Sequence, residues 1–253
     1  MLPPTERFSD RVKDYDKARP SYPSEVIDLL RQLCGIDSES FVVDIGCGTG
    51  IFTQQLLSFG CLVVGVEPNE PMLEAALTNL SSHAQFLGTM GTGESTGLAD
   101  KCVDLITVAQ AFHWLNPSEA RVEFRRILKP TGWVCLVWNE RKSAGTAFLE
   151  GYERVLKDFA PEYALVKHRN NADASILAWF EDPGAQVYSF ANNHLIDLDG
   201  LLCRAFSSSY VPADGTAERQ AIEHELTSLF CATEKDGLVS FEYETKVFVG
   251  QLS

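Results

Sequence analysis

The hydrophobic positions of this chain change period from one segment to the next. In the first half, short continuous apolar runs alternate with stretches whose apolar residues recur every three or four positions. The apolar runs predict buried strands, at residues 41–45, 62–67, 84–88, 103–109 and 133–138. The other stretches predict helices, beginning near Tyr22 and over 51–60, 69–80 and 117–128. Buried strands separated by helices indicate a parallel sheet that is covered on both faces.

Polar residues mark the helix ends in this half. Asn69 and Asn116 stand where a helix would begin, and each is followed by a proline one or two positions later, as is typical of a capped start. The sequence "KPTG" at 129–132 is expected to end the helix before the strand at 133–138.

The second half is less regular. Helical spacing covers three stretches, at 146–160, 198–207 and 216–232, and a sixth strand is expected at 186–194. "FEYETKVFVG", at 241–250, alternates apolar and charged residues, as in an antiparallel or edge strand. With no linker in sight, we expect one domain.

Charge and cysteine usage narrow the function classes. The formal net charge of −14 argues against a nucleic-acid partner or an anionic membrane surface. The seven cysteines include no C-x-x-C pair, which indicates free thiols in a reducing compartment, and no ligand spacing for a metal is evident. The opening residues lack an apolar signal segment and no run approaches the ~20 residues of a membrane span. We expect a cytoplasmic protein.

"FVVDIGCGTGIF", at 41–52, carries the chemistry. A glycine loop between a strand and a helix binds ligands closely, but its G-x-G-x-G spacing differs from the G-x-G-x-x-G of dinucleotide sites. Asp44 precedes the loop and would repel a pyrophosphate but attract a cationic group. Glu67, 21 residues beyond Gly46, ends the next strand and is placed to accept ribose hydroxyls. The loop therefore favours a cationic adenosine compound.

Four motifs in order, "VVDIGCGTG", "GVEPNEPML", "GTGESTGLADKCVDLITVAQAFHW" and "RILKPTGW", resemble the class I S-adenosylmethionine-dependent methyltransferases. Within this class the chain is similar to the small-molecule group of trans-aconitate methyltransferase-like proteins. Its segment "FSDRVKDYDKARPSYP" resembles the opening segment of that group. The resemblance implies an α/β, Rossmann-like seven-stranded sheet, mostly parallel, with helices on both faces and an antiparallel last strand. It also implies S-adenosyl-L-methionine as cofactor. Within the single domain, 1–253, the segment 1–35 would cover the cofactor, 36–140 would bind it, and a helical insertion at 198–233 would cap the substrate pocket.

The same resemblance implies roles for single residues. The cofactor would be bound by Tyr15, Arg19, Asp44, Gly46, Cys47, Gly48, Thr49, Gly50, Glu67, Pro68, Met72, Gly93, Glu94, Ala109 and Gln110. Arg19 would pair with the cofactor carboxylate, the alternative being a surface ion pair. Family members often carry Ala-Glu where this chain has Gly93 and Glu94, a change that a backbone contact would tolerate.

The acceptor site is less defined. His113 follows the fourth strand and is the candidate base or substrate orienter, against a merely structural role. Trp114, Trp138 and Tyr210 are candidate pocket residues, with core packing or a plain loop as the alternative. A carboxylate acceptor would need no base, whereas a hydroxyl or an ammonium would.

Three functions follow. The first is methyl transfer to a small molecule, with a carboxylate as one option. The second is a protein that binds the cofactor without turnover, and the third an NAD-dependent oxidoreductase, against which the loop spacing and Asp44 count.

Overall fold

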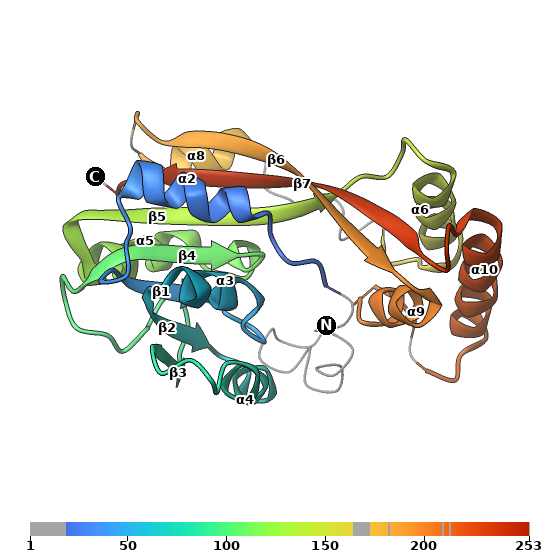
Figure 1. Cartoon of the computed structure of the whole chain (residues 1–253), viewed down its shortest axis with the longest axis horizontal. Coiled ribbons are helices and arrows are strands. Elements are labelled where there is room, and N and C mark those ends of the chain that lie inside the picture. Colours follow the sequence, from blue (N-terminus) through green and yellow to red (C-terminus); the bar gives the residue numbers. More distant parts are fainter. Residues whose placement is uncertain (1–18, 164–172, 182, 209, 213, 253) are drawn as a thin grey trace.

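A seven-stranded sheet organises the computed structural model, which describes residues 19–163, 173–181, 183–208, 210–212 and 214–252 (Figure 1). The strand order is β3-β2-β1-β4-β5-β7-β6. The strands are β1 (Phe41–Ile45), β2 (Leu62–Glu67), β3 (Phe86–Met90), β4 (Val103–Ala109), β5 (Leu128–Arg141), β6 (Gln186–Ile196) and β7 (Val239–Gly250). Neighbours from β3 through β5 pair in parallel, whereas β7 pairs antiparallel with both β5 and β6. The expected fold is therefore confirmed, including the reversed last strand.

Helices cover both faces of the sheet. The helices in the described residues, including those of a separate lobe, are α2 (Ser24–Cys34), α3 (Ile51–Phe59), α4 (Glu70–Asn79), the 3₁₀ turn η2 (Phe112–Trp114), α5 (Pro117–Ile127), α6 (Ala147–Phe159), α8 (Asp173–Phe180), α9 (Leu198–Phe206) and α10 (Ala217–Thr233). Residues of α2 and α3 share one buried cluster with the sheet, and residues of α5 and α8 share another. The two clusters lie on opposite faces, as a parallel sheet requires.

The expected helix starts are confirmed by their hydrogen bonds. The Asn69 side chain accepts from the Met72 amide at 3.1 Å. The Asn116 side chain accepts from the Ser118 amide at 3.2 Å. Each asparagine satisfies an amide that the first turn leaves without a helical partner.

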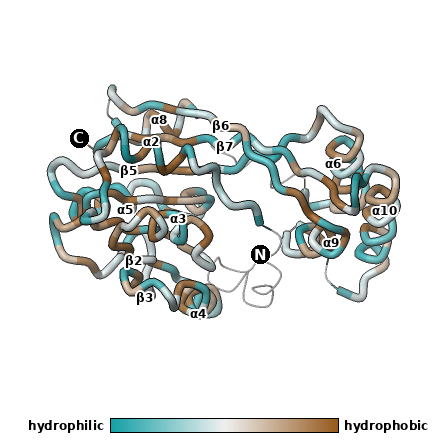
Figure 2. Tube along the Cα trace, in the orientation of Figure 1, coloured by the Kyte–Doolittle hydropathy of each residue, from teal (hydrophilic) through white to brown (hydrophobic). Residues whose placement is uncertain are grey.

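A second lobe stands at the far end of β6 and β7, where α6, α9 and α10 pack together (Figure 1). Its core is a third buried cluster that is rich in aromatic residues, among them Phe148, Tyr152, Phe241 and Tyr243. We call α6, α9, α10 and the adjoining ends of β6 and β7 the helical lobe. The strands reach it through a stretch that is mostly hydrophilic (Figure 2).

Two sequence predictions were wrong in detail. The helix before "KPTG" ends at Ile127, as expected, but the strand begins earlier than predicted, because β5 starts at Leu128, which pairs with Val103. The register then shifts so that Leu105 pairs with Trp133, which accommodates Pro130 outside the regular ladder. The pattern also missed α8, whose eight residues are too short and too uniformly apolar to show helical spacing.

None of the helices in the described ranges is both long and apolar enough to span a bilayer.

Candidate functional site

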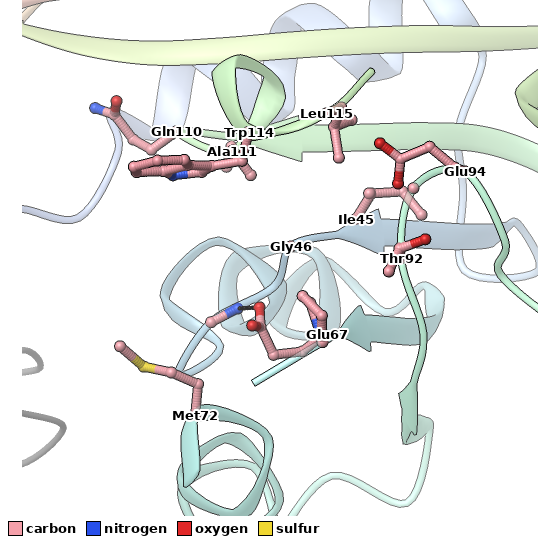
Figure 3. Close-up of a pocket in the computed structure, with 14 residues that line it drawn as sticks. Ile45, Gly46, Glu67, Met72, Thr92, Glu94, Gln110, Ala111, Trp114 and Leu115 are labelled. Atoms are coloured by element: carbon pink, nitrogen blue, oxygen red, sulfur yellow. Dashed lines mark hydrogen bonds between the residues drawn. The ribbon is translucent and has the colours of Figure 1, made fainter. Parts of the chain in front are cut away.

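A cavity of about 210 Å³ opens where the carboxyl ends of β1, β2 and β4 meet (Figure 3). It is lined by Ile45, Gly46, Gly48, Glu67, Pro68, Met72, Thr92, Gly93, Glu94, Ala109, Gln110, Ala111, Trp114 and Leu115. Trp114 and Gln110 lie across it from Glu67 and Met72 (Figure 3). The place is the usual one for a ligand in an open parallel sheet, beside the strands where the order reverses. We call it the β1–β4 cavity.

The glycine loop forms one wall of this cavity. Gly46 has φ 65° and Gly48 has φ 57°, values that favour glycine. A Cβ on Gly46 would lie 2.5 Å from the Ala111 Cβ, whereas a Cβ on Gly48 would meet nothing within 4 Å. Gly46 is thus required for close packing between two strand ends, and Gly48 leaves open space on the ligand side.

Glu67 at the end of β2 braces the loop. Its carboxylate accepts from the Gly48 amide at 2.9 Å and from the Asn69 amide at 3.0 Å. The residue is only 7% exposed, and burial raises the pKa of its carboxyl above the usual value. Each oxygen retains a further lone pair, so the carboxylate can also accept hydroxyls from a ligand.

Asp44 lies behind the glycine loop and is not among the residues that line the β1–β4 cavity. The side chain is 1% exposed, and its two oxygens accept from the Thr53 hydroxyl at 2.6 Å and the Thr107 hydroxyl at 2.8 Å. Burial raises the pKa of Asp44 to about 6, although both hydrogen bonds oppose the shift. Asp44 therefore ties β1 to α3 and β4 behind the loop.

Three other residues of the loop also lie away from the β1–β4 cavity. Cys47 is buried against β2, where a Cβ on Gly65 would lie 2.7 Å from its sulfur, and burial raises the pKa of its thiol well above the usual value. Thr49 and Gly50 instead line a second cavity of about 410 Å³ on the α3 side of the loop. The loop thus separates two cavities.

The rim of the β1–β4 cavity comes from α4 and the loop after β3. Gly93 is explained locally, because a Cβ there would lie 2.8 Å from a methyl carbon of Leu115 and 3.1 Å from one of Ile45. The Glu94 carboxylate accepts from the Asn116 amide at 2.6 Å, which joins this loop to the start of α5. The glycine in place of alanine therefore follows from packing inside this chain.

The end of β4 is held in an unusual conformation. Gln110 has φ 59°, a left-handed value that a residue with a side chain adopts only under constraint. Its amide donates to the Val137 carbonyl at 2.8 Å and its side chain donates to the Asn139 carbonyl at 3.1 Å. Such strain is often found where a site must be shaped.

The two tryptophan candidates lie in different places: Trp114 lines the β1–β4 cavity, and Trp138 packs against the core of the sheet. Trp114 lines the cavity, and the ring of exposed His113 lies 4.6 Å from it between centroids, outside the cavity wall. Trp138 packs instead among Phe112, at 6.2 Å, and Phe248, at 5.6 Å. Trp138 is thus half-buried against the core and is not among the residues that line the β1–β4 cavity, and its role in a substrate pocket stays a prediction.

The remaining candidates lie elsewhere. Arg19 lines the second cavity with Thr49 and Gly50. Tyr210 belongs to the helical lobe, where its ring lies 5.0 Å from that of Tyr163. No residue of 198–233 lines the β1–β4 cavity, and the expected role of this segment over a substrate pocket stays a prediction. Tyr15 lies outside the described residues.

Sequence reasoning missed four residues that line the cavity: Ile45, Thr92, Ala111 and Leu115. Ile45 and Ala111 are direct neighbours of predicted residues at strand ends, so their positions could have been inferred. Thr92 and Leu115 lie in loops, where no periodic pattern indicates the direction of a side chain.

The cavity is suited to a largely apolar ligand with hydroxyls. Its titratable side chains are Glu67 and Glu94, and both accept from backbone amides. In the part of the chain that the structure describes, no group of three His, Cys, Asp or Glu side chains could hold a metal ion.

Comparison with known proteins agrees with this geometry. Residues 43–136 match the protein family described as a methyltransferase domain. An uncharacterized methyltransferase of Mycobacterium tuberculosis is 40% identical over 134 residues, which cover 53% of this chain and 52% of that protein. A probable S-adenosylmethionine-dependent methyltransferase of Saccharomyces cerevisiae is 31% identical over 123 residues, covering 47% of this chain and 42% of that protein. The chain spans about half the length of the curated relatives it matches.

A solved structure reproduces the fold over nearly the whole chain. A protein described as a type II methyltransferase from Anaeromyxobacter dehalogenans superposes with a TM-score of 0.69 at 19% identity, covering 92% of this chain and 98% of that one. At this identity the likeness concerns the fold.

Proposed function

Because residues 43–136 match a methyltransferase-domain family and resemble uncharacterized methyltransferases, we propose that the chain transfers a methyl group from S-adenosylmethionine to a small-molecule acceptor. The observation that carries the proposal is the β1–β4 cavity itself, in which Gly46, Gly48 and Glu67 converge at the carboxyl ends of adjacent parallel strands. Bound there, S-adenosylmethionine would supply a methyl group that its sulfonium has already activated.

The residues present fit this cofactor. Gly48 leaves open space where a side chain would stand, so the backbone can approach a ligand closely. Glu67 keeps acceptor capacity for two ribose hydroxyls, while Pro68 and Met72 offer apolar contacts to an adenine. Trp114 supplies an aromatic wall on the opposite side.

In this proposal Asp44 acts on the cofactor indirectly. Its carboxylate accepts hydrogen bonds from the hydroxyls of Thr53 and Thr107, so it positions the loop and does not contact the sulfonium. Gln110 is held by the Asn139 carbonyl and shapes the wall beside which the methyl group would lie. The protein's contribution is then alignment, which accounts for up to about 7–11 kcal/mol of barrier lowering in well-oriented reactions.

For the acceptor we propose a carboxylate. The side chains that line the cavity include no histidine, lysine or cysteine that could remove a proton, and exposed His113 lies outside its wall. A carboxylate is already an ionised nucleophile and needs no such base. Methylation of a hydroxyl or an ammonium would require His113 to turn into the site.

Two alternative functions can be distinguished from methyl transfer by experiment, one by measuring cofactor binding and the other by measuring product formation. An NAD-dependent oxidoreductase would bind NADH, and the charged groups around the loop oppose a pyrophosphate. A protein without turnover would bind S-adenosylmethionine but form no methylated product.

Calorimetric titration with S-adenosylhomocysteine and with NADH tests the proposal. We expect micromolar binding of S-adenosylhomocysteine and none of NADH. Glu67→Gln should weaken the former at least tenfold, since one hydrogen bond to a charged group contributes about 1.5–3 kcal/mol. Glu119→Gln, which changes an exposed carboxylate on α5, serves as the matched control. Binding of NADH alone would refute the proposal, and product formation with an acceptor would exclude a protein without turnover.

A further inference from the structure

A buried tyrosine hydroxyl in the helical lobe has no hydrogen-bond partner among the described residues. Tyr243 on β7 is 1% exposed, and its Oη atom is buried and unsatisfied there. A buried hydroxyl without a partner is unfavourable by about 1–3 kcal/mol, so such groups usually have a function or a ligand. The Tyr243 hydroxyl is therefore a candidate donor to a ligand.

Positively charged groups surround this hydroxyl. The electrostatic neighbours of Tyr243 are Arg204, Arg19, Arg141 and Tyr210. The Arg204 guanidinium carbon lies 5.4 Å from the centroid of the Tyr243 ring and 4.9 Å from that of Phe241. Arg204 itself is only 9% exposed. The ring stacking fixes this guanidinium over the faces of the Phe241 and Tyr243 rings.

Arg141 is fixed by a second set of contacts. Its Nη2 atom lies 2.7 Å from a Glu153 carboxylate oxygen and 2.9 Å from the Tyr163 hydroxyl, and Tyr163 donates to the same oxygen at 2.6 Å. The guanidinium also stacks over the Tyr152 ring at 4.9 Å. Glu153 thus compensates Arg141 and holds it in one orientation. The guanidinium groups of both arginines are therefore held in place by contacts with neighbouring side chains.

The strand ladder connects this cluster with the β1–β4 cavity. Gln110, which lines that cavity, donates to the Asn139 carbonyl on β5. Arg141 lies two residues further along β5, about 7 Å at the usual strand rise, and pairs directly with Tyr243 of β7. Arg141 and Tyr243 therefore lie two residues along the sheet from the strand ends where the methyl group would lie.

We propose that Tyr243, Arg204 and Arg141 recognise an anionic group of the methyl acceptor, a carboxylate or a phosphate. This inference rests on the proposed function and adds the residues that select the substrate. Tyr243 donates its hydroxyl to the anion, Arg204 contributes charge-assisted hydrogen bonds, and Tyr210 bounds the site. Burial raises the pKa of Tyr243, so the hydroxyl keeps its proton and remains a donor at neutral pH. The aromatic rings offer an apolar surface to the body of the acceptor.

Ligand pairs that differ only in charge test the proposal. Protein saturated with S-adenosylhomocysteine is titrated calorimetrically with benzoate, phenylacetate and succinate, with the primary amide of each, and with phenyl phosphate. We expect at least one anion to bind tenfold or more tightly than its amide. Comparison of the carboxylates with phenyl phosphate identifies the preferred anion.

Three variants locate the binding. Arg204→Gln and Tyr243→Phe should each weaken the anion at least fivefold and leave its amide within twofold, whereas Arg204→Lys should retain part of the preference. The control is Arg219→Gln, because Arg219 also stacks on a lobe aromatic, 3.6 Å from the Phe206 centroid, but outside the cluster. All variants should bind S-adenosylhomocysteine with unchanged affinity.

Each result decides between the two proposals. If the wild-type protein does not bind S-adenosylhomocysteine, the proposed function fails. If it does, but no anion is preferred to its amide, or the preference survives both Arg204→Gln and Tyr243→Phe, the acceptor proposal is overturned alone. If Arg204→Gln does not fold, Tyr243→Phe and the wild-type ligand pairs still decide.

Discussion

The two halves of the molecule are built from different kinds of side chain. Around β1 to β4, the core is mostly aliphatic, and the wall of the cavity depends on glycines and on backbone amides held by Glu67. In the helical lobe, the core is aromatic and contains the buried charges of Glu153 and Arg204, with the Arg141 side chain only 12% exposed beside them. The first region exposes backbone groups of a glycine loop, whereas the second contains charged side chains that are held in place by their neighbours. The match to the methyltransferase family, 43–136, covers the first half and ends before the lobe.

The largest effect is expected from breaking the charge pair of the lobe. Glu153→Ala leaves Arg141 buried without its carboxylate, and such losses typically destabilise by about 3–5 kcal/mol. Urea unfolding should show this loss, while S-adenosylhomocysteine affinity measured below the transition stays within twofold. A large loss of cofactor affinity in the folded variant would mean that the halves do not act separately.

The glycine loop should show the opposite response. Gly46→Ala brings a Cβ to 2.5 Å from the Ala111 Cβ at a left-handed φ, and we expect a loss of about 2–4 kcal/mol of stability together with most cofactor binding. Gly48→Ala has a similar φ but open space, so about 1–2 kcal/mol of strain is expected. Equal effects of the two alanines would contradict the role assigned to the Gly46 contact.

The buried carboxyl of Asp44 should make stability depend on pH. Its pKa is about 6 in the fold against 3.8 ordinarily, so between these values the folded state binds more protons than the unfolded state. Stability from this group therefore falls as pH rises from about 4 to about 6, by up to about 3 kcal/mol, and stays low above. The difference in unfolding free energy between the protein and Asp44→Asn should change by that amount across the window. A constant difference would mean that Asp44 is ionised throughout.

Arg19 sharpens the boundary of the cofactor site. It lines the second cavity with Thr49 and Gly50, on the α3 side of the loop. If it pairs with the cofactor carboxylate, Arg19→Ala should weaken S-adenosylhomocysteine by about tenfold, the usual scale of one charge-assisted hydrogen bond. Arg31→Ala, at an exposed position on α2, is the control. Unchanged affinity in Arg19→Ala would remove this residue from the site.

The smallest effect is expected at His113. The residue is exposed and lies outside the wall of the cavity, although its ring is 4.6 Å from that of Trp114. With a carboxylate acceptor, His113→Gln should lower the rate of methyl transfer by less than about threefold at pH 7, because no proton needs to be removed. A hundredfold loss would indicate base catalysis and a different acceptor atom.

Much of the fold was predictable because it is encoded locally. Apolar runs and helical spacing identified the strands and most helices, and Asn69 and Asn116 marked two helix starts that the hydrogen bonds confirm. The short helix α8 was missed because it is apolar all round. Of the predicted cofactor residues, nine line the β1–β4 cavity, among them Glu67 and Gln110. Their roles stay predictions.

The sequence by itself determined the sheet, the glycine loop and the acid that follows it, since periodicity and spacing act within a few residues. Only the tertiary structure decided that Asp44 accepts from two threonine hydroxyls behind the loop, and that Trp138 packs against Phe112 and Phe248. It also decided that Arg141 meets Tyr243, 102 residues away by numbering, through the pairing of β5 with β7. Such contacts depend on strand register and on which face each side chain takes, and neither can be read from local pattern.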